Sequence, residues 1–503
     1  MNAAPRALFV TSNGTGLGHL TRSMAIGRRF EGSLESLFIT FSAGAPVVRG
    51  QGFPVEYIAS YDRPGAGTDL TWTLRTRDRL RAAVREIEPR IVIFDGTHPY
   101  ERLLPVLRST GAPLVWCRRA LWRADADPAP LHRTHLFDAV LEPGEIGAGA
   151  DRGPTATRRA EAHGVDPIVL LDRGQLVARE EAERALGLEP GRRNVLVQLG
   201  QGPGVPEATA RCVERLVARG DVQVAALSSA LATLGDVPEG VVELRATYPI
   251  ARYFAAFDAA ISAAGYNAVH ELAGLGVPAL LVPMERQTDD QAGRAQEAER
   301  AGVAVACTGA DDPALAGRVD DLLDPERFVR LRRGLDQVAG WEGAAQAARW
   351  LEGLAAEPSH RAGGPVQAAR RPGPRVRLRR AWIFAASVPR TLARVTSQRL
   401  KRPRMRVLVL ALGIDPDRHQ RELERAIAEA GEQPERILVV TDRLDFGPLL
   451  RAGVGFEHIP ARSDRQAELA NVAYEDFRAG RLELIRRRRP RPRRVIELGR
   501  RSP

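Results

Sequence analysis

Glycines placed directly after apolar runs are the first residues in this sequence that could do chemistry. Gly14, Gly16 and Gly18 alternate with other residues, follow one apolar run, and are succeeded by His19 and a helical pattern. Glycine lets backbone N–H groups come close to an anionic ligand, and free N–H groups at a helix N-terminus favour negative charge. The alternative is an ordinary tight turn, with His19 on the surface of the first helical turn.

This glycine spacing argues against a dinucleotide cofactor. It reads G-x-G-x-G-H rather than G-x-G-x-x-G. The next expected strand, at 37–41, is followed by no acidic residue that could hold a ribose diol. We therefore expect no bound cofactor. A second loop, Gly200-Gln201-Gly202, also follows an apolar run and should contact a phosphate or a sugar, or else form a plain turn.

The densest pattern lies between residues 265 and 291. At 265–267 a strand ends and a helix begins, so free N–H groups could hold a diphosphate. Glu271 follows within two helical turns and could reach ribose hydroxyls, or simply compensate the helix dipole. Asp290 and Gln291 could hold vicinal sugar hydroxyls, although Asp290 alone could also be a helix N-cap.

These loops need a fold that brings several strand ends to one edge. Apolar strand candidates alternate with helical patterns in the first 170 residues, and a second such series begins near residue 193. Repeated strand–helix–strand units imply a parallel sheet, and two doubly wound halves leave a cleft at the carboxyl ends of both sheets. The expected strands are 7–11, 37–41, 90–94, 113–117, 139–141, 194–199, 222–227, 241–245, 259–262, 279–282 and 303–306, with helices at 19–29, 76–87, 206–219, 251–257, 266–275 and 290–301.

The block from Gly265 to Gln291 resembles the donor-binding region of GT-B nucleotide-sugar glycosyltransferases. It is close to the MurG-type group and shares the Gly-aromatic-Asn…Glu…Asp-Gln run of the UDP-glycosyltransferases. The loop Gly14–His19 resembles the glycine-rich loop and histidine at the start of the same superfamily. The resemblance covers about residues 5–355. It implies a GT-B α/β fold, with two doubly wound Rossmann-like domains facing a cleft, beside which a small C-terminal α/β unit remains.

The resemblance implies an inverting, metal-independent hexosyl- or N-acetylhexosaminyltransferase that moves a sugar from a nucleotide-diphosphate donor, expected to be a UDP-sugar, to an acceptor hydroxyl. His19 would be the general base, since an ordinary histidine pKa of about 6.5 suits proton abstraction near neutral pH. Asp95 would orient it. The donor-binding residues are then Gly16, Gly18, Gly200, Gln201, Gly202, Thr247, Tyr248, Gly265, Tyr266, Asn267, Glu271, Asp290 and Gln291.

The chain also departs from the resembled families. Ala263 stands where plant-type relatives carry a phosphate-binding histidine, which leaves the phosphate to backbone groups. MurG-type relatives have Gln-Gln in place of Asp290-Gln291. A nucleotide-sugar hydrolase is an alternative, because Gly16–Arg22 resembles the Gly-x-Gly-His-x-x-Arg start of the UDP-sugar hydrolase of pseudaminic acid synthesis. The same fold would also suit a non-catalytic sugar-nucleotide-binding scaffold or a 2-epimerase.

The acceptor side is less specified. His98 follows the strand at 90–94 and should face the cleft. Arg118, next to Arg119 and close to Trp122, could bind an anionic or polyprenyl-phosphate acceptor, or belong to a solvated basic turn. Three pairs with metal-like spacing are interpreted as loop residues rather than ligands: Asp125 and Asp127, His132 and His135, and Asp415 and Asp417.

Charge is distributed unevenly along the 503 residues, whose formal net charge is +11. Segments 361–406 and 481–503 hold 24 of the 73 basic residues and two of the 62 acidic ones, which leaves 49 basic and 60 acidic residues elsewhere. The stretch 375–406 interleaves Arg with Trp and Phe. It could lie on an anionic membrane surface, or form a linker with a helix at 379–399. Nucleic acid is not expected as a partner, because the remaining body is acidic and shows no binding fold.

The expected organisation is an acceptor domain, a donor domain, a linker, a small unit and a tail. We find no secretory signal and no apolar run long enough to cross a membrane. Cys117, Cys212 and Cys307 are scattered, as in a reducing compartment. We therefore expect a cytoplasmic protein, or one peripheral on the inner membrane face. The expected bounds are 1–175, 190–355, 356–404, 405–485 and 486–503, the small unit having strands at 406–410 and 437–441, helices at 418–430 and 446–452, and a further segment at 456–459.

Overall fold

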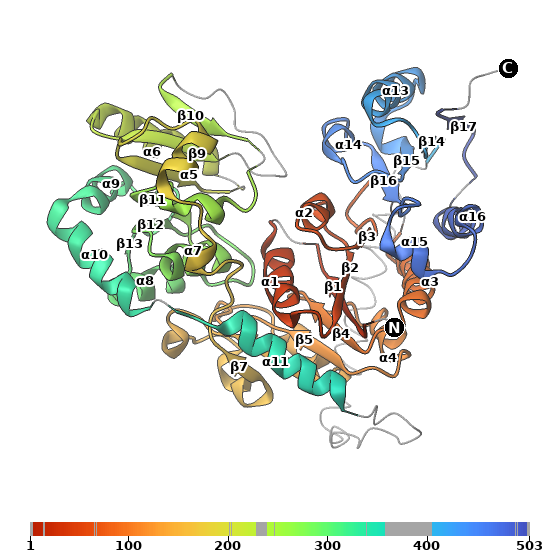
Figure 1. Cartoon of the computed structure of the whole chain (residues 1–503), viewed down its shortest axis with the longest axis horizontal. Coiled ribbons are helices and arrows are strands. Elements are labelled where there is room, and N and C mark those ends of the chain that lie inside the picture. Colours follow the sequence, from red (N-terminus) through yellow and green to blue (C-terminus); the bar gives the residue numbers. More distant parts are fainter. Residues whose placement is uncertain are drawn as a thin grey trace.

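The computed structural model describes residues 4–13, 16–64, 66, 68–200, 202, 204–227, 239–245, 247–338, 340–357, 405–487, 489 and 491–499. Three sheets organise these residues (Figure 1), and their strands pair in parallel throughout. The predicted GT-B α/β class is confirmed. Most of the basic stretch 375–406, with its expected helix at 379–399, lies outside the described residues.

A seven-stranded sheet forms the first lobe, in the order β3-β2-β1-β4-β5-β6-β7. The five predicted strands are present. The two edge strands β3 and β7 were not predicted, since three residues are too short to show a pattern. Helix α3 begins earlier than predicted, capped by the Thr68 side chain, because its first buried turns include polar residues. The strands are β1 (Arg6–Thr11), β2 (Glu35–Thr40), β3 (Val55–Tyr57), β4 (Ile91–Asp95), β5 (Leu114–Cys117), β6 (Ala139–Pro143) and β7 (His163–Val165), and the helices are α1 (Gly18–Gly27), α2 (Ala45–Gly50), α3 (Asp69–Ile87) and α4 (Leu104–Arg108).

A six-stranded sheet forms the second lobe, in the order β10-β9-β8-β11-β12-β13. The predicted helix at 251–257 is a 3-10 segment, Ile250–Ala256. The strands are β8 (Asn194–Gln198), β9 (Gln223–Leu227), β10 (Val241–Leu244), β11 (Ala259–Ala263), β12 (Ala279–Val282) and β13 (Ala304–Ala306), and the helices are α5 (Arg179–Leu186), α6 (Val205–Arg219), α7 (Tyr266–Leu275), α8 (Gln291–Arg300), α9 (Leu315–Leu323) and α10 (Pro325–Gln337).

The chain returns to the first lobe after the second. Helix α11 (Gly343–Ala356) packs against α1 and the 3-10 segment Arg28–Phe30, and Figure 1 shows it at the bottom of the first lobe. Its Ala347, Ala348 and Leu351 are fully buried. The predicted second segment, 190–355, therefore contains a last helix that belongs by its contacts to the first lobe.

The third unit is a four-stranded sheet in the order β16-β15-β14-β17. Its first three strands and two of its helices match the predicted ones closely. The tail from residue 486 adds the fourth strand by pairing with β14. The elements are β14 (Val407–Ala411), α13 (Pro416–Glu429), β15 (Ile437–Thr441), α14 (Gly447–Arg451), β16 (Gly455–His458), α15 (Arg465–Leu469), α16 (Tyr474–Arg486) and β17 (Arg494–Glu497).

The third unit docks on the edge of the first lobe. Strand β16 lies beside β3, and α15 and α16 pack on α3. Tyr57 stacks on Phe456 with ring centroids 5.3 Å apart. A buried group of charges, here called the unit junction, crosses this contact. It consists of Glu56, Arg79, Glu457, Arg481 and Arg489.

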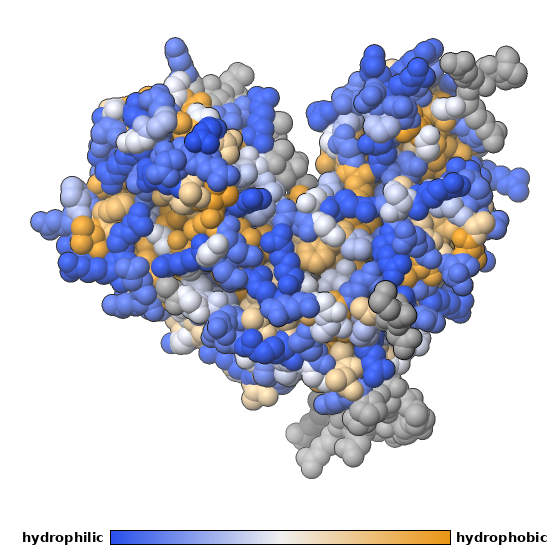
Figure 2. Space-filling model, in the orientation of Figure 1, coloured by the Kyte–Doolittle hydropathy of each residue, from blue (hydrophilic) through white to orange (hydrophobic). Residues whose placement is uncertain are grey.

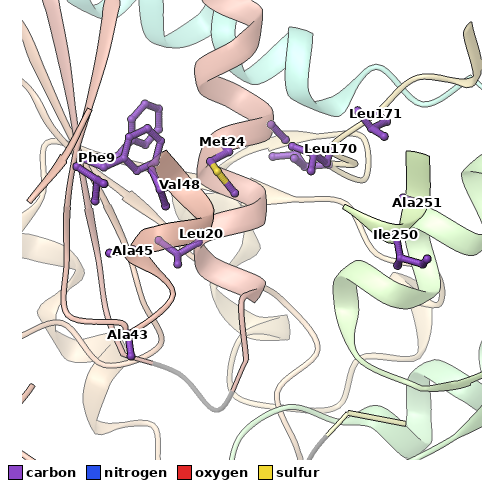
Figure 3. Close-up of a cluster of buried hydrophobic side chains, with 14 of the residues drawn as sticks. Phe9, Leu20, Met24, Ala43, Ala45, Val48, Leu170, Leu171, Ile250 and Ala251 are labelled. Atoms are coloured by element: carbon purple, nitrogen blue, oxygen red, sulfur yellow. The ribbon is translucent and has the colours of Figure 1, made fainter. Parts of the chain in front are cut away.

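Helix α1 is held on all sides, which fixes whatever its first turn carries. Figure 3 shows it between the first sheet, represented by Phe9, and the pair Leu170 and Leu171, with Ile250 of the second lobe beyond them. Residues 20–26 are all buried. The start of α1 is therefore a rigid platform beside the second lobe.

Candidate active site

Figure 2 shows the surface hollowed between the second lobe and the third unit. Contacts between the lobes bring the starts of α1 and α7 together. The Asn267 side-chain N–H donates to the Gly18 carbonyl at 3.2 Å, and the hydroxyls of Thr21 and Tyr248 are 2.8 Å apart. The two loops that the sequence singled out therefore face each other across the lobes.

His19 and Asp95 form the pair that the sequence predicted to act together. Strands β1 and β4 are neighbours in which Thr11 pairs with Asp95, so the loop after β1 returns beside that carboxylate. The His19 Nδ1 lies 2.7 Å from Asp95 Oδ1. Asp95 is fully buried, whereas the His19 side chain is 16% exposed. With Nδ1 donating to Asp95, Nε2 is the nitrogen that could take a proton.

Arg22 also contacts Asp95, and it was not among the predicted site residues. Its Nε donates to Asp95 Oδ2 at 3.0 Å and its Nη2 donates to Oδ1 at 2.5 Å. Arg22 lies three positions after His19 in α1, so both lie on one helix face. That spacing was the available signal.

Charges around His19 set its protonation. Burial lowers the pKa of His19, Asp95 opposes this, and Arg22 and Arg119 lower it further. Burial alone would raise the pKa of Asp95, but Arg22 and His19 hold that pKa below its usual range. A neutral imidazole beside a charged carboxylate is the state that a general base requires near neutral pH.

Tyr266 lies in the contact between the lobes rather than on the open helix end. Its side chain is 3% exposed, and its hydroxyl accepts a hydrogen bond from the Ile168 backbone N–H at 2.9 Å. Sequence reasoning predicted its place on the helix, but not where its ring points. What α7 leaves toward the hollow is backbone: Gly265 is the N-cap without a capping side chain, and it is partly exposed.

A buried charge network surrounds the Tyr266 ring and joins the lobes. Both Arg294 Nε and Nη2 donate to Glu145, at 2.9 and 2.7 Å, and Asp289 accepts from Arg294 and Arg119 at 2.8 and 3.1 Å. Asp289 also pairs with Trp122 through an isolated antiparallel β-bridge. We call this network, with Tyr266, the lobe junction. Sequence reasoning missed it, because its members come from separate loops with no shared spacing.

Asp290 and Gln291 each have a structural partner beside the predicted donor site. Asp290 Oδ1 accepts from the Gly293 N–H at 2.9 Å, which is an N-cap of α8. Gln291 Oε1 accepts from the Met284 N–H at 2.9 Å. A Cβ built on Gly265 would lie 3.9 Å from Gln291 Nε2, so this amide stands at the start of α7.

Glu271, Thr247 and Tyr248 lie farther along the second lobe. Burial raises the pKa of Glu271 to about 7, with a backbone hydrogen bond from Leu170 opposing it. Burial raises the pKa of Tyr248 and the charge of Glu271 raises it further, so the two residues lie close together. Thr247 Oγ1 donates to the Arg245 carbonyl at 3.2 Å. Glu271 therefore lies against the Leu170 backbone, and the Tyr248 hydroxyl lies 2.8 Å from that of Thr21 in α1.

The second glycine loop follows β8, next to β11 in the sheet. Gly200 and Gly202 have φ values of +75° and +143°, which favour glycine, and Gly204 is the N-cap of α6. Gln201 lies outside the described residues. A Cβ on Gly202 would lie 3.3 Å from Arg286 Nη1, so a guanidinium that the sequence reasoning passed over lies against this loop. At Gly16 and Gly18, in contrast, a Cβ would meet nothing within 4 Å.

The two residues predicted on the acceptor side differ in accessibility. His98 is exposed at the end of β4. Arg118 is only 1% exposed and donates to Glu142 at 3.0 Å, so its guanidinium is held within the first lobe, and Arg119 is the one that reaches the lobe junction. Nearby, Asn13 donates to Ser60 at 3.2 Å, and Tyr61 is 45% exposed.

Of the pairs interpreted as loop residues, Asp125 and Asp127 lie in a loop, whereas Asp415 and Asp417 start α13 and His132 and His135 lie in the 3-10 segment Ala129–Leu136. Asp127 accepts from the Ala129 N–H, Asp415 from the Asp417 N–H, and Asp125 from Arg123. His135 Nδ1 lies 2.7 Å from the His132 carbonyl. Among the described residues, no group of three His, Cys, Asp or Glu side chains is arranged to hold a metal, and no helix has the length and apolar character to cross a bilayer.

Known proteins share this organisation. The model for the glycosyltransferase family 28 C-terminal domain matches residues 207–326. The chain is 27% identical over 301 residues to the UDP-N-acetylglucosamine–N-acetylmuramyl-(pentapeptide) pyrophosphoryl-undecaprenol N-acetylglucosamine transferase of Clavibacter michiganensis, covering 57% of this chain and 77% of that one. It is 29% identical over 308 residues to the Nocardioides enzyme of the same name, covering 57% and 80%.

The solved structure of the spinosyn forosaminyltransferase SpnP shares the fold, with a TM-score of 0.50 at 16% identity over 70% of this chain and all of that one. The family match lies in the second lobe, and the alignments to the sequence relatives are longer than this match. Together with the two facing doubly wound sheets, these findings support a GT-B fold and a similarity to nucleotide-sugar glycosyltransferases.

Proposed function

We propose that the protein transfers a sugar from a nucleotide-diphosphate donor to an acceptor hydroxyl, with inversion and without a metal, and that His19 is the general base. The observation that carries this proposal is the 2.7 Å contact of His19 with buried Asp95, opposite the uncapped start of α7. The acceptor hydroxyl would lose its proton to His19 Nε2 as it attacks the sugar. Asp95 would fix the imidazole tautomer and stabilise the imidazolium that forms.

The donor would lie along the carboxyl ends of β8, β11 and β12. Backbone N–H groups at Gly265, together with the helix dipole, would stabilise the charge that develops on the departing diphosphate. Glu271 would accept hydrogen bonds from ribose hydroxyls beside Tyr248, and Gln291 would contact the sugar. The relatives are named for a UDP-N-acetylglucosamine donor, which supports a UDP-linked N-acetylhexosamine as the donor here.

For the acceptor we propose a lipid-linked molecule, which would place the protein at the cytoplasmic face of a membrane. The relatives' names specify a pyrophosphoryl-undecaprenol acceptor. In this chain, Tyr61 and Leu70 expose apolar side chains, by 45% and 54%, after β3 and at the start of α3. A polyprenyl-pyrophosphate-linked sugar in detergent, compared with free sugars, tests this assignment. Equal rates on both would refute it.

The test of the whole proposal is a His19→Ala variant. We expect sugar transfer to fall by about 10²–10⁴-fold while binding of UDP, measured by calorimetry, stays within about twofold. Retention of the wild-type transfer rate would refute the role of His19. Incubation with donor alone addresses the hydrolase alternative, since stoichiometric release of free sugar would favour water as the acceptor.

A further inference from the structure

Arg22 shares the carboxylate that orients the proposed base. Asp95 Oδ1 is contacted both by His19 Nδ1, at 2.7 Å, and by Arg22 Nη2, at 2.5 Å. The second oxygen, Oδ2, accepts from Arg22 Nε at 3.0 Å. Only 2% of the Arg22 side chain is exposed. A two-point contact from a planar guanidinium fixes both the position and the plane of the carboxylate.

Arg22 is itself held from the opposite lobe. Its guanidinium carbon lies 5.5 Å from the centroid of the Tyr266 ring, within the range of a cation–π contact. That ring is fixed by the Ile168 N–H and by Arg119 and Arg294, each 6.0 Å away. The contact therefore runs from the second lobe through Arg22 and Asp95 to His19.

We propose that Arg22 is a positioning residue, which sets the Asp95 carboxylate against His19 and is held in place by the Tyr266 ring of the second lobe. This inference rests on the proposed function, because it needs His19 to be the base. It assigns Tyr266 a role other than capping the diphosphate. It also makes the alignment of the base depend on contact between the lobes.

The charged and titratable groups that act on His19 come from three elements. They are Asp95 of β4, Arg22 of α1 and Arg119 after β5. Burial lowers the pKa of His98, which follows β4, and His19 is one of the nearby groups that lower it further. Cys117 of β5 lies against Asp95 and Arg22. Removing the Arg22 charge takes away one group that disfavours the imidazolium and leaves Asp95 unopposed. Both changes raise the pKa of His19.

The test is the pH profile of kcat/KM, whose acid limb reports the base in the free enzyme. We expect Arg22→Gln to move that limb to higher pH by about one unit. Arg22→Lys keeps the charge but loses the two-point contact, so its limb should stay in place while kcat falls. An unmoved limb in a folded Arg22→Gln variant, or equal shifts in both variants, would overturn the proposal.

A second pair of variants leaves Arg22 intact. Tyr266→Phe keeps the ring and should leave the limb in place. Tyr266→Leu removes the ring, so the Arg22 guanidinium can move away from Asp95 and His19, and the limb should shift in the same direction as in Arg22→Gln, by a smaller amount. If Tyr266→Leu and Tyr266→Phe give the same profile, the link to the second lobe is wrong. This pair carries the test even if Arg22→Gln does not fold.

Arg481→Gln is the matched control. Arg481 is a 3% exposed arginine of the third unit. It contacts Glu56 of the unit junction and Glu86 of α3, and it has no contact with His19, Asp95 or Arg22 among the described residues. It should lower stability without moving the profile. His19→Ala distinguishes failure of the proposed function from failure of the role of Arg22. If it retains activity, the proposed function fails, whereas an essential His19 with an unmoved Arg22→Gln limb refutes only the role of Arg22.

Discussion

The lobe junction and the unit junction are built from the same chemistry, yet only one has a group that can reach a substrate. Each buries arginines against carboxylates between two sheets. In the unit junction, Arg79 joins Glu56 to Glu457 at 2.8 and 2.7 Å, and aromatic rings close the contact. At the lobe junction, the Tyr266 ring contacts Arg22, which shares the Asp95 carboxylate with His19, and the His19 side chain is 16% exposed.

The two junctions show that buried ion pairs can hold two parts of the molecule together without taking part in catalysis. A buried ion pair is costly to break, because removing one partner leaves a charge without compensation. It does chemistry only where a titratable member meets solvent or ligand. Substitutions in the two junctions should therefore differ in their effect on rate more than in their effect on stability.

The largest contrast is expected between Asp95→Asn and Glu56→Gln. Asp95→Asn leaves buried Arg22 without its carboxylate and should lower the free energy of unfolding by about 3–5 kcal/mol. Glu56→Gln should lower it less, because Arg79 keeps Glu457 and Arg481 keeps Glu86. Asp95→Asn should in addition reduce kcat by about 10²–10⁴-fold, because His19 loses its orienting partner. Denaturant melts and single-turnover rates measure the two effects. A comparable rate loss in folded Glu56→Gln would abolish the distinction.

Phe456→Ala tests how much the stacking of Phe456 on Tyr57 stabilises the contact at the unit junction. Phe456 is 1% exposed and stacks on Tyr57, so its truncation should cost about 3–5 kcal/mol of stability. We expect UDP affinity to be unchanged below the melting temperature. A loss of UDP affinity with the second lobe still folded would mean that the third unit acts on the donor site.

The pH dependence of UDP affinity in Glu271→Gln tests whether Glu271 contacts the donor. Because burial raises the pKa of Glu271 to about 7, folding favours its neutral form. The stability it contributes is present below its ordinary pKa and is lost as pH rises through about 7. Ribose hydroxyls would instead favour the ionised form. UDP affinity should therefore rise several-fold relative to Glu271→Gln between about pH 5.5 and 8, as calorimetry can measure. A constant ratio would remove Glu271 from the donor site.

The smallest effect is expected at a helix cap. Asp290→Ala and Asp324→Ala each remove an N-cap, of α8 and α10, and should cost about 1 kcal/mol of stability. If Asp290 also contacts the donor sugar, only its variant should raise the donor KM. Equal KM values would leave Asp290 as a cap alone.

Much of the fold could be predicted from alternating apolar runs, and α7 was predicted with its observed bounds, Tyr266–Leu275. The pairing of His19 with Asp95 was predicted from the resemblance, and the two side chains lie 2.7 Å apart. Arg118 and Arg119 show what could not be predicted. They are adjacent in the sequence, yet one turns to Glu142 and the other to Asp289. Which way each points depends on residues that only the folded chain brings close.

The lobe junction was missed for the same reason. Glu145 and Arg294 are 149 positions apart, and no local pattern marks either residue. The ring of Tyr266 was expected at the ligand, because its position on the helix can be predicted but the burial of its side chain cannot. Strand β17 was missed because three of its four residues are exposed, so it has no apolar periodicity.

The arginine-rich tail contains strand β17 and so has a structural role that its charge alone does not suggest. It forms one end of the four-stranded sheet, paired on one side with β14, and Val495 is 45% exposed. An open strand with an apolar residue is a template for stacking with other chains. Arg491, Arg493 and Arg494 surround it with like charge, so copies of the protein repel one another where they would otherwise add strand to strand.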